Sequence, residues 1–289
     1  MKRKKIVLIM ILFVLFVNGC VESKKENIVR KNIKRNSSEV KKIINTTKEE
    51  SDVKELYKKL ELNGKLEYRI FQMAMKGFEI ISPKQKKYIA IVDFTQNSTK
   101  KRFFLIDIFN KSIVYNDLVA HGMNTGEKEA EVFSNEEDSH MSSLGFYVTG
   151  EAYYGSNGYS LRLDGLDKGL NDNARKRDIV IHGAPYVSES SISEMNRIGR
   201  SWGCPALSPT ISEDVIEKLK DGNLLFVYAN NYEKDSTVLK SWNIDFIGIR
   251  SKKVIRIYDF FICIEFKCKL NIVFINQIYK INTNPKIGV

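Results

Sequence analysis

Hydrophobic periodicity changes once along the chain, and this change constrains the fold more than any other feature. Apolar residues recur at helical spacing over residues 50–62 and 67–81. From residue 87 they come in short runs separated by turn residues, which is typical of β-strands. Strands are predicted over residues 88–94, 102–107, 111–120, 145–150, 159–163, 178–182 and 224–228. Many short strands beside a few helices predict a β-rich α+β domain, a sandwich or barrel with flanking helices.

Turn and cap residues place some boundaries. The stretch from Gly155 to Gly158 predicts a tight turn between two of the strands. A further helix is predicted over residues 208–221. Thr210 and Glu213 form a capping-box pattern at its start, and Gly222 is the predicted C-cap.

Composition excludes several classes of protein. The chain has 289 residues, of which 43% are apolar and 28% charged, as in globular proteins. It contains no CxxC pair, no GxGxxG and no P-loop pattern, so zinc-ribbon and nucleotide-binding folds are not indicated. The net charge of +11 favours anionic partners, but solubility explains it better than nucleic-acid binding does.

The N-terminal residues predict an export signal. Basic residues precede twelve consecutive apolar residues over 6–17, which is the length of a signal-peptide core and too short to span a bilayer. Gly19-Cys20 follows and resembles the bacterial lipoprotein processing box, in which the cysteine is lipidated. We therefore expect a signal peptide over 1–19 and lipidation of Cys20. An uncleaved signal anchor is the alternative, and either implies an exported protein facing the periplasm or cell wall.

Two further segments differ in composition from the domain predicted over residues 51–240. Residues 20–50 are rich in Lys, Glu, Asn and Ser, as in a flexible tether. Residues 241–289 contain 12 isoleucines, and no role is assigned to them. Cys263 and Cys268 lie in this tail, and their spacing argues against a local disulfide.

One cysteine and one histidine suggest chemistry within the domain. Cys204 is the domain's single cysteine, and His182 precedes it by 22 residues at the end of an apolar strand. A thiol of ordinary pKa needs a neighbouring imidazole to act as a nucleophile at neutral pH. Gly203 before the cysteine allows a tight turn, and Pro205 after it favours an extended conformation. From the residues alone, a buried histidine beside an inert core cysteine is an equal alternative.

A serine nucleophile is the rival interpretation. Residues 199–203 match GxSxG, the serine elbow of the α/β-hydrolases. That arrangement needs a histidine after the serine, and none follows His182. The serine-hydrolase interpretation is therefore rejected.

The motif resembles that of a known family. His182-Gly183 followed by Ser201-Trp202-Gly203-Cys204 is similar to the signature of the L,D-transpeptidase catalytic domain, in the murein subgroup with Ser-x-Gly-Cys-Pro-Ala. The resemblance covers roughly residues 60–239 and includes segments 120–122, 133–135, 142–147, 149–151, 158–161 and 171–175. Ala206 stands where many members of the wider family have an arginine.

The resemblance implies roles for individual residues. Cys204 would be the nucleophile and His182 the base that deprotonates it, oriented by the Gly183 carbonyl. N–H groups at Gly203 and Cys204 would stabilise the oxyanion, with Ser201 in support. Substrate contacts are expected from Arg200, Trp202, His121, Asn157 and Tyr159.

Roles without a direct part in function are the alternatives for some of these residues. Arg200 could be a solvated surface residue and Trp202 a core residue. His121 could be structural, at a strand end. His140 lies among acidic residues, which hints at a metal, but a solvated side chain is the expectation.

The family's reaction is acyl transfer on peptidoglycan stem peptides through a cysteine thioester, giving 3→3 cross-links. The alternatives are an L,D-carboxypeptidase, another murein thiol amidohydrolase, and a non-catalytic wall-binding lipoprotein. Expected partners are peptidoglycan stem peptides and, through the lipid, a membrane. No cofactor, metal or nucleic acid is expected, and the oligomeric state is not predicted.

Overall fold

The computed structural model describes residues 49–241. The chain divides into two units at Ser236/Thr237, and only the short helix α6 (Thr237–Ser241) is described in the second unit. The predicted signal peptide, the lipidated Cys20, most of the tether and the isoleucine-rich tail lie outside the described residues. Within 49–241, no helix has the length and hydropathy that crossing a membrane requires.

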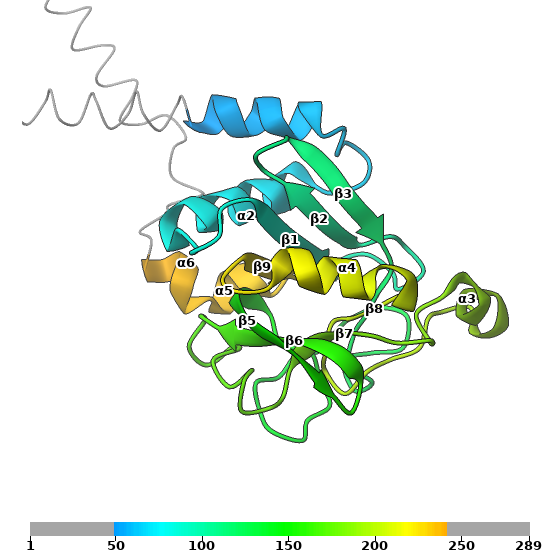
Figure 1. Cartoon of the computed structure of the whole chain (residues 1–289). Helices are drawn as coiled ribbons and strands as arrows, with labels where there is room; N and C mark the ends of the chain where they lie inside the picture. The colour runs from blue at the N-terminus through cyan, green and yellow to red at the C-terminus, as the bar shows by residue number, and fades with distance from the viewer. Residues whose placement is uncertain (1–48, 242–289) are drawn as a thin grey trace, which may run out of the picture. The chain divides into compact units, whose positions relative to one another are not determined.

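The first unit is built on one mixed sheet of nine strands, nearly closed into a barrel (Figure 1). The strand order is β3-β2-β1-β9-β5-β6-β7-β8-β4. Only the pairs β1–β9 and β7–β8 are parallel. The strands are β1 Tyr88–Asp93, β2 Phe103–Asp107, β3 Ser112–Asp117, β4 Val119–Ala120, β5 Gly145–Gly155, β6 Gly158–Gly165, β7 Val180–Gly183, β8 Ala206–Leu207 and β9 Leu224–Tyr228. The β-rich α+β prediction is confirmed.

Helices cover this sheet. Residues 49–59 are helical, followed by α2 (Tyr68–Ile81), α3 (Glu189–Met195), α4 (Pro209–Leu219) and α5 (Tyr232–Asp235). Helix α2 contacts β1 and β9, and α4 contacts β7 and β1. Each buries an apolar stripe, as its spacing predicts. Gly77 of α2 lies against Phe146 of β5, where an added Cβ would come within 2.2 Å of the ring.

The strand predicted over residues 111–120 is in fact two strands. The Asp117 carboxylate accepts a hydrogen bond from the N–H of Leu118 at 2.7 Å, and the chain leaves β3 there. Strand β3 pairs with β2, whereas β4 pairs with β8 at the other end of the strand order. Neither β8 nor α3 was predicted, because a two-residue strand has no periodicity and α3 is largely polar.

The predicted capping box of α4 is wrong. Ser208, rather than Thr210, is the N-cap: its Oγ accepts from the Thr210 N–H, and Pro209 occupies the first helical turn. The C-cap is Lys220 and not Gly222. Gly222 has a φ of +105° and lies beyond the helix, where its carbonyl accepts from Gln85.

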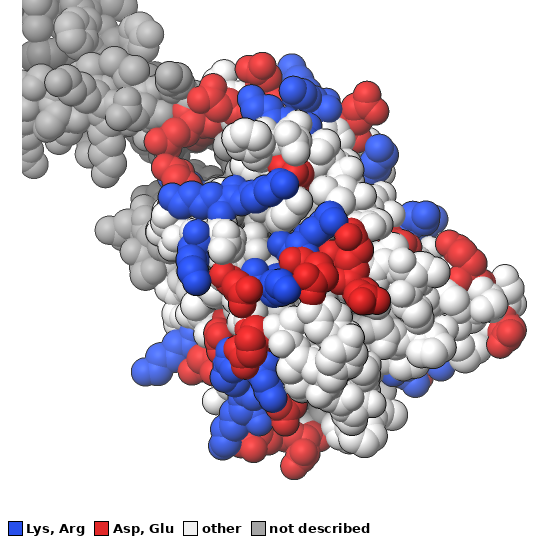
Figure 2. All heavy atoms as spheres, viewed as in Figure 1, with Lys and Arg blue, Asp and Glu red and all other residues white. Residues whose placement is uncertain are grey.

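Charges of both signs are interspersed on the surface shown in Figure 2. Many pair directly, as do Arg175 with Asp164 and Lys218 with Asp214. On this face, the positive net charge does not gather into a single basic patch.

The corrected cap gives the first prediction. Ser208→Ala removes the acceptor for an orphan N–H and should lower the free energy of unfolding by about 1 kcal/mol. Glu213→Gln changes an exposed side chain that caps nothing and should stay within about 0.5 kcal/mol of the parent. Urea unfolding of both variants measures these changes. A larger loss of unfolding free energy for Glu213→Gln than for Ser208→Ala would show that Glu213 caps the helix.

Candidate active site

The parallel pairing of β7 with β8 brings the predicted histidine and cysteine together. His182 pairs with Ala206, and Gly183 pairs with Leu207. Cys204 precedes Ala206 by two residues and therefore comes level with Val180 at the start of β7. The Val180 N–H donates to the Cys204 Sγ at 3.5 Å.

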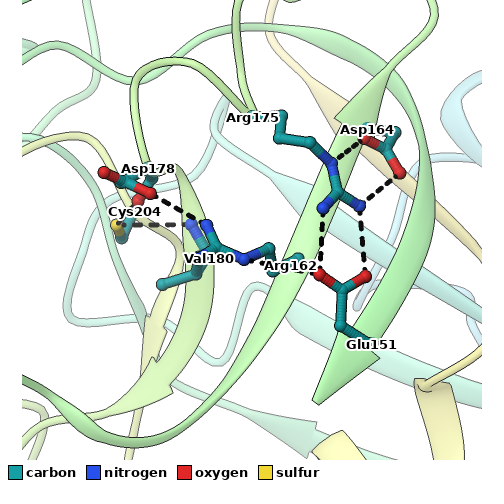
Figure 3. A network of polar contacts seen from close by, with 7 residues as sticks. All are labelled: Glu151, Arg162, Asp164, Arg175, Asp178, Val180 and Cys204. Carbon is teal, nitrogen blue, oxygen red and sulfur yellow. Dashed lines mark hydrogen bonds and ion pairs between the residues drawn. The ribbon is translucent and has the colours of Figure 1, made fainter. Parts of the chain in front are cut away.

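The Cys204 thiol is almost entirely buried, with 8% of the residue exposed. The Sγ donates to the main-chain carbonyl of Asp178 at 3.6 Å. Asp178 has a φ of +51°, a conformation that few residues other than glycine adopt. Its side chain accepts from Arg162 of β6 at 2.8 Å, which ties this unusual residue to the sheet (Figure 3).

The ion pairs continue from Arg162 across two strands. Arg162 lies 3.5 Å from Glu151 of β5, and Glu151 also pairs with Arg175. Arg175 reaches Asp164 of β6 as well, at 2.5 Å. Figure 3 shows this chain of contacts, which begins at Cys204 and ends at Asp164 of β6. The segment that carries Asp178 is therefore fastened to both strands.

His182 is 5% exposed and is oriented by its own strand. Its Nδ1 lies 3.0 Å from the carbonyl oxygen of Gly183, the contact that the family resemblance implied. A carbonyl only accepts, so the bonding assigns the proton to Nδ1 and leaves Nε2 as the basic nitrogen. Burial lowers the pKa of His182, although the Gly183 carbonyl opposes this, so burial favours the neutral ring.

The cysteine is also neutral in this conformation. Burial raises the pKa of the Cys204 thiol to about 11, against the opposing effects of the Val180 N–H and the Arg177 charge. Within residues 49–241, no hydrogen bond joins the thiol to the His182 ring. Burial thus favours the neutral form of both groups and disfavours a preformed thiolate–imidazolium pair.

Ser201 fixes the turn that ends on the cysteine. Its Oγ donates to the Cys204 carbonyl at 2.7 Å and accepts from the Gly203 N–H at 3.1 Å. Gly203 has a φ of +119°, and an added Cβ would lie 2.7 Å from the Met141 carbonyl oxygen. The Gly203 N–H was expected to stabilise an oxyanion, but Ser201 occupies it. The Cys204 N–H, which donates to no oxygen of the described chain, is the remaining candidate.

The structure places Arg200 and Trp202 beside the turn, where Arg200 is engaged by the protein and Trp202 is exposed. Arg200 donates to the carbonyls of Met123 and Gly126 and pairs with Glu127 at 2.9 Å. It therefore fastens a loop rather than presenting a free cation to a substrate. Trp202 is 71% exposed, so it is not a core residue. Its ring stacks on His140, with centroids 4.7 Å apart.

The expectation that His121 lines the cleft is not met. The ring is buried, with Nδ1 2.7 Å from Arg102 and Nε2 3.1 Å from the Gly126 carbonyl. Burial and the Arg102 charge lower the pKa of His121 to about 4. Both ring nitrogens are thus used within the protein. In the part of the chain that the structure describes, no three potential metal ligands lie close enough together to hold an ion. This applies to the surroundings of His140 as well.

Asn157 and Tyr159 lie at and after the β5–β6 turn, away from the cysteine. Ser160 pairs with His182, so Tyr159 points to the opposite face of the sheet. That face carries α4, and the Tyr159 hydroxyl donates to Glu217 there. Asn157 is exposed in the two-residue turn. The structure does not bring either residue to Cys204.

Sequence reasoning missed Arg177 and Asp178. Both precede β7 and are separated from it by Ile179, and Asp178 supplies the carbonyl that accepts a hydrogen bond from the thiol. The only available signal was an Arg-Asp pair just ahead of the apolar run over residues 179–181.

The Ser201 contacts generate a stability prediction. Ser201→Ala leaves the buried Gly203 N–H unpaired and removes one of the two hydrogen bonds to the Cys204 carbonyl, which also accepts from the Ala206 N–H, so it should lower the free energy of unfolding by about 1–3 kcal/mol. Ser193→Ala, which removes an exposed hydroxyl that donates to a helix carbonyl, is the matched control and should have little effect. Equal unfolding midpoints in urea for the two variants would contradict this role of Ser201.

The protonated thiol predicts a pH profile. Because the pKa of Cys204 lies near 11, its thiolate fraction rises about tenfold per pH unit between pH 7 and 9. Alkylation by iodoacetamide, followed by mass spectrometry of the peptide containing Cys204, should show that rise without a plateau. A rate that is already constant at pH 7 would instead indicate a preformed thiolate.

Comparison with known proteins agrees with the site motif. The family model described as "L,D-transpeptidase catalytic domain" matches residues 62–228, which include His182 and Cys204. No curated protein matches the chain.

Solved structures also match, at low identity. An L,D-transpeptidase from Mycobacterium smegmatis is 12% identical, covering 50% of this chain and 59% of that one, with a TM-score of 0.31. One from Stackebrandtia nassauensis is 15% identical, covering 62% and 76%, with a TM-score of 0.31. L,D-transpeptidase 3 from Mycobacterium tuberculosis, in complex with a faropenem-derived adduct, is 14% identical, covering 51% and 61%, with a TM-score of 0.31.

The match thus spans less than two thirds of the M. smegmatis chain. The family model matches more than half of this chain and therefore shows the family. This chain belongs to the family of L,D-transpeptidase catalytic domains, which are acyltransferases.

Proposed function

We propose that the protein is a peptidoglycan L,D-transpeptidase that forms 3→3 cross-links through a thioester on Cys204. The observation that carries the proposal is that a basic imidazole nitrogen lies on β7 and a buried thiol lies in the turn that leads into its partner β8, inside the segment that matches the family. The substrate is a tetrapeptide stem that ends in D-alanine.

The first half-reaction transfers the stem to the enzyme. The Cys204 Sγ attacks the carbonyl carbon of the third stem residue, a diamino acid, and the thiol proton passes to Nε2 of His182. The amide bond to D-alanine then breaks, and His182 returns the proton to the leaving amine. The Cys204 N–H stabilises the oxyanion between these steps.

The second half-reaction releases the cross-linked product. An amine of a neighbouring stem attacks the thioester, gives a proton to His182, and expels the Cys204 sulfur, which recovers that proton. Water in place of the amine would make the same site an L,D-carboxypeptidase.

The neutral resting pair fits this sequence of proton transfers. The thiol hydrogen, held by the Asp178 carbonyl, has to turn toward Nε2 of His182 as the substrate arrives. Because the Gly183 carbonyl holds Nδ1–H, Nε2 is the nitrogen left to receive it. His182 then removes the thiol proton as a general base during the attack, so no thiolate has to form beforehand.

We further propose that the protein works at the cell envelope as a lipoprotein. The predicted processing site at Cys20 would leave a lipid-anchored chain, with residues 21–50 as a tether between lipid and domain. An enzyme acting on nearby murein fits such an anchor.

Replacement of the nucleophile tests the mechanism. Cys204→Ala should abolish acyl transfer and leave the fold intact, because the change removes only the sulfur. Cys263→Ala, outside the matched domain, is the control and should retain activity. Transfer by a folded Cys204→Ala protein would show that the nucleophile is misassigned.

The assay is mass spectrometry of the chain from Val21 onward, incubated with purified disaccharide-tetrapeptide. A dimer lacking one D-alanine supports the transpeptidase. Loss of D-alanine without a dimer indicates the carboxypeptidase. No change, in a folded protein with a free Cys204 thiol, refutes both and favours another amidohydrolase or a wall-binding protein.

A further inference from the structure

Arg177 is a cation held entirely by neutral groups. Its Nη1 donates to the Ser134 carbonyl at 2.8 Å and to the Ser143 Oγ at 3.3 Å. Its Nη2 donates to the Met141 carbonyl at 2.7 Å and to the Ser139 Oγ at 3.1 Å. Four contacts thus converge on residues 134–143, and none of them is with a carboxylate.

The other cations of the same segment are arranged differently. Arg175 pairs with Glu151 and Asp164, and Lys176 pairs with Glu137. These are ordinary surface ion pairs. Arg177 is half-buried, and burial lowers its pKa, yet within the described chain it forms no ion pair. A buried charge without a counter-charge is costly, so its position calls for a reason.

The segment that Arg177 holds forms a wall of the cysteine turn. The Met141 carbonyl lies against Gly203, as the close approach to its missing Cβ shows. The Ser142 Oγ donates to the Gly203 carbonyl at 3.2 Å, and His140 stacks on Trp202. Displacement of residues 139–143 would therefore move the turn on which the sulfur is mounted.

The Arg177 charge also acts on the sulfur. Among the groups that influence the Cys204 thiol, Arg177 and the Val180 N–H favour its ionised form, whereas burial and Asp178 oppose it. Arg162 engages the Asp178 carboxylate, and the neighbouring phenols of Tyr147 and Tyr186 carry raised pKa values, so they stay neutral. Glu136 is the acidic group whose field reaches Arg177, without an ion-pair contact.

We propose that Arg177 is a positioning residue of the acyl-transfer site. It holds residues 134–143 against the cysteine turn and keeps there a positive charge that no carboxylate contacts. In the reaction, negative charge passes from sulfur to the carbonyl oxygen and back, and a cation held by neutral acceptors remains available to stabilise it. The effect on turnover rests on the proposed function, whereas the effect on the thiol does not.

Two variants separate the charge from the contacts. Arg177→Gln removes the charge, and Arg177→Lys keeps it but cannot reproduce the four contacts. Lys168→Gln is the matched control, because it removes an exposed cation that takes no part in the network around Asp178. Each is made in the full chain, checked for folding by circular dichroism, and assayed both for alkylation of Cys204 by iodoacetamide from pH 7 to 10 and for kcat and KM with disaccharide-tetrapeptide.

Arg177→Gln should shift the alkylation profile to higher pH by about 0.5–1 unit, which slows the reaction about three- to tenfold at pH 8. Arg177→Lys should keep the parental profile and lower kcat more than it raises KM. Lys168→Gln should change neither the alkylation profile nor the kinetic constants.

A folded Arg177→Gln protein with the parental profile would overturn the charge role, and parental kcat in Arg177→Lys would overturn the positioning role. If Arg177→Gln does not fold, Arg177→Met, an uncharged side chain of similar length, replaces it: a profile that shifts to higher pH supports the charge role, and an unchanged profile overturns it. Failure of the parent to turn over the tetrapeptide would refute the proposed function but leave the alkylation comparison intact.

Discussion

The site depends on a two-residue parallel pairing between β7 and β8. This short ladder joins His182 to Ala206 and so fixes how far along β7 the cysteine turn lies. It sits near the end of the strand order, where only β4 follows β8. So short a pairing contributes few hydrogen bonds of its own, and side-chain contacts must hold the cysteine turn in place. Ser201 supplies them within the turn, and residues 139–143 supply them from outside.

Polar side chains bonded to main-chain groups are the recurring device around the sulfur. Arg200 fastens the loop that follows His121, in the same way that Arg177 fastens residues 134–143, and Arg102 donates to the Val119 carbonyl of β4 just before that loop. The 24 residues between Ala120 and Gly145 form no named strand or helix, so these arginines take over the role of a hydrogen-bonded ladder. Loops held in this way can approach a nucleophile more closely than a regular strand could.

Much of the fold could be predicted from the sequence, because its central strands are short apolar runs bounded by turns. Strands β1, β2 and β9 were placed to within a residue or two for that reason. Strand β8 could not be, since two residues carry no period and their conformation is set by the partner strand. The same limit applies to the site. Cys204 and His182 stand out by type, but the roles of His121 and Arg177 are set by partners 19 and 34–43 residues away.

Burial explains both the neutral state of the site and the need for its supports. The surroundings that exclude water from Cys204 penalise a thiolate, and those around His182 penalise an imidazolium. Burial disfavours both charged forms, so in the proposed mechanism the proton moves to His182 as the sulfur attacks the reacting carbonyl. In the proposed mechanism this keeps the thiol protonated, and hence resistant to chance oxidation, until the substrate arrives. The stabilising groups must then be in place beforehand, because a buried site has no water to reorganise around the new charge. The Val180 N–H, the Cys204 N–H and the fixed charge of Arg177 meet that requirement.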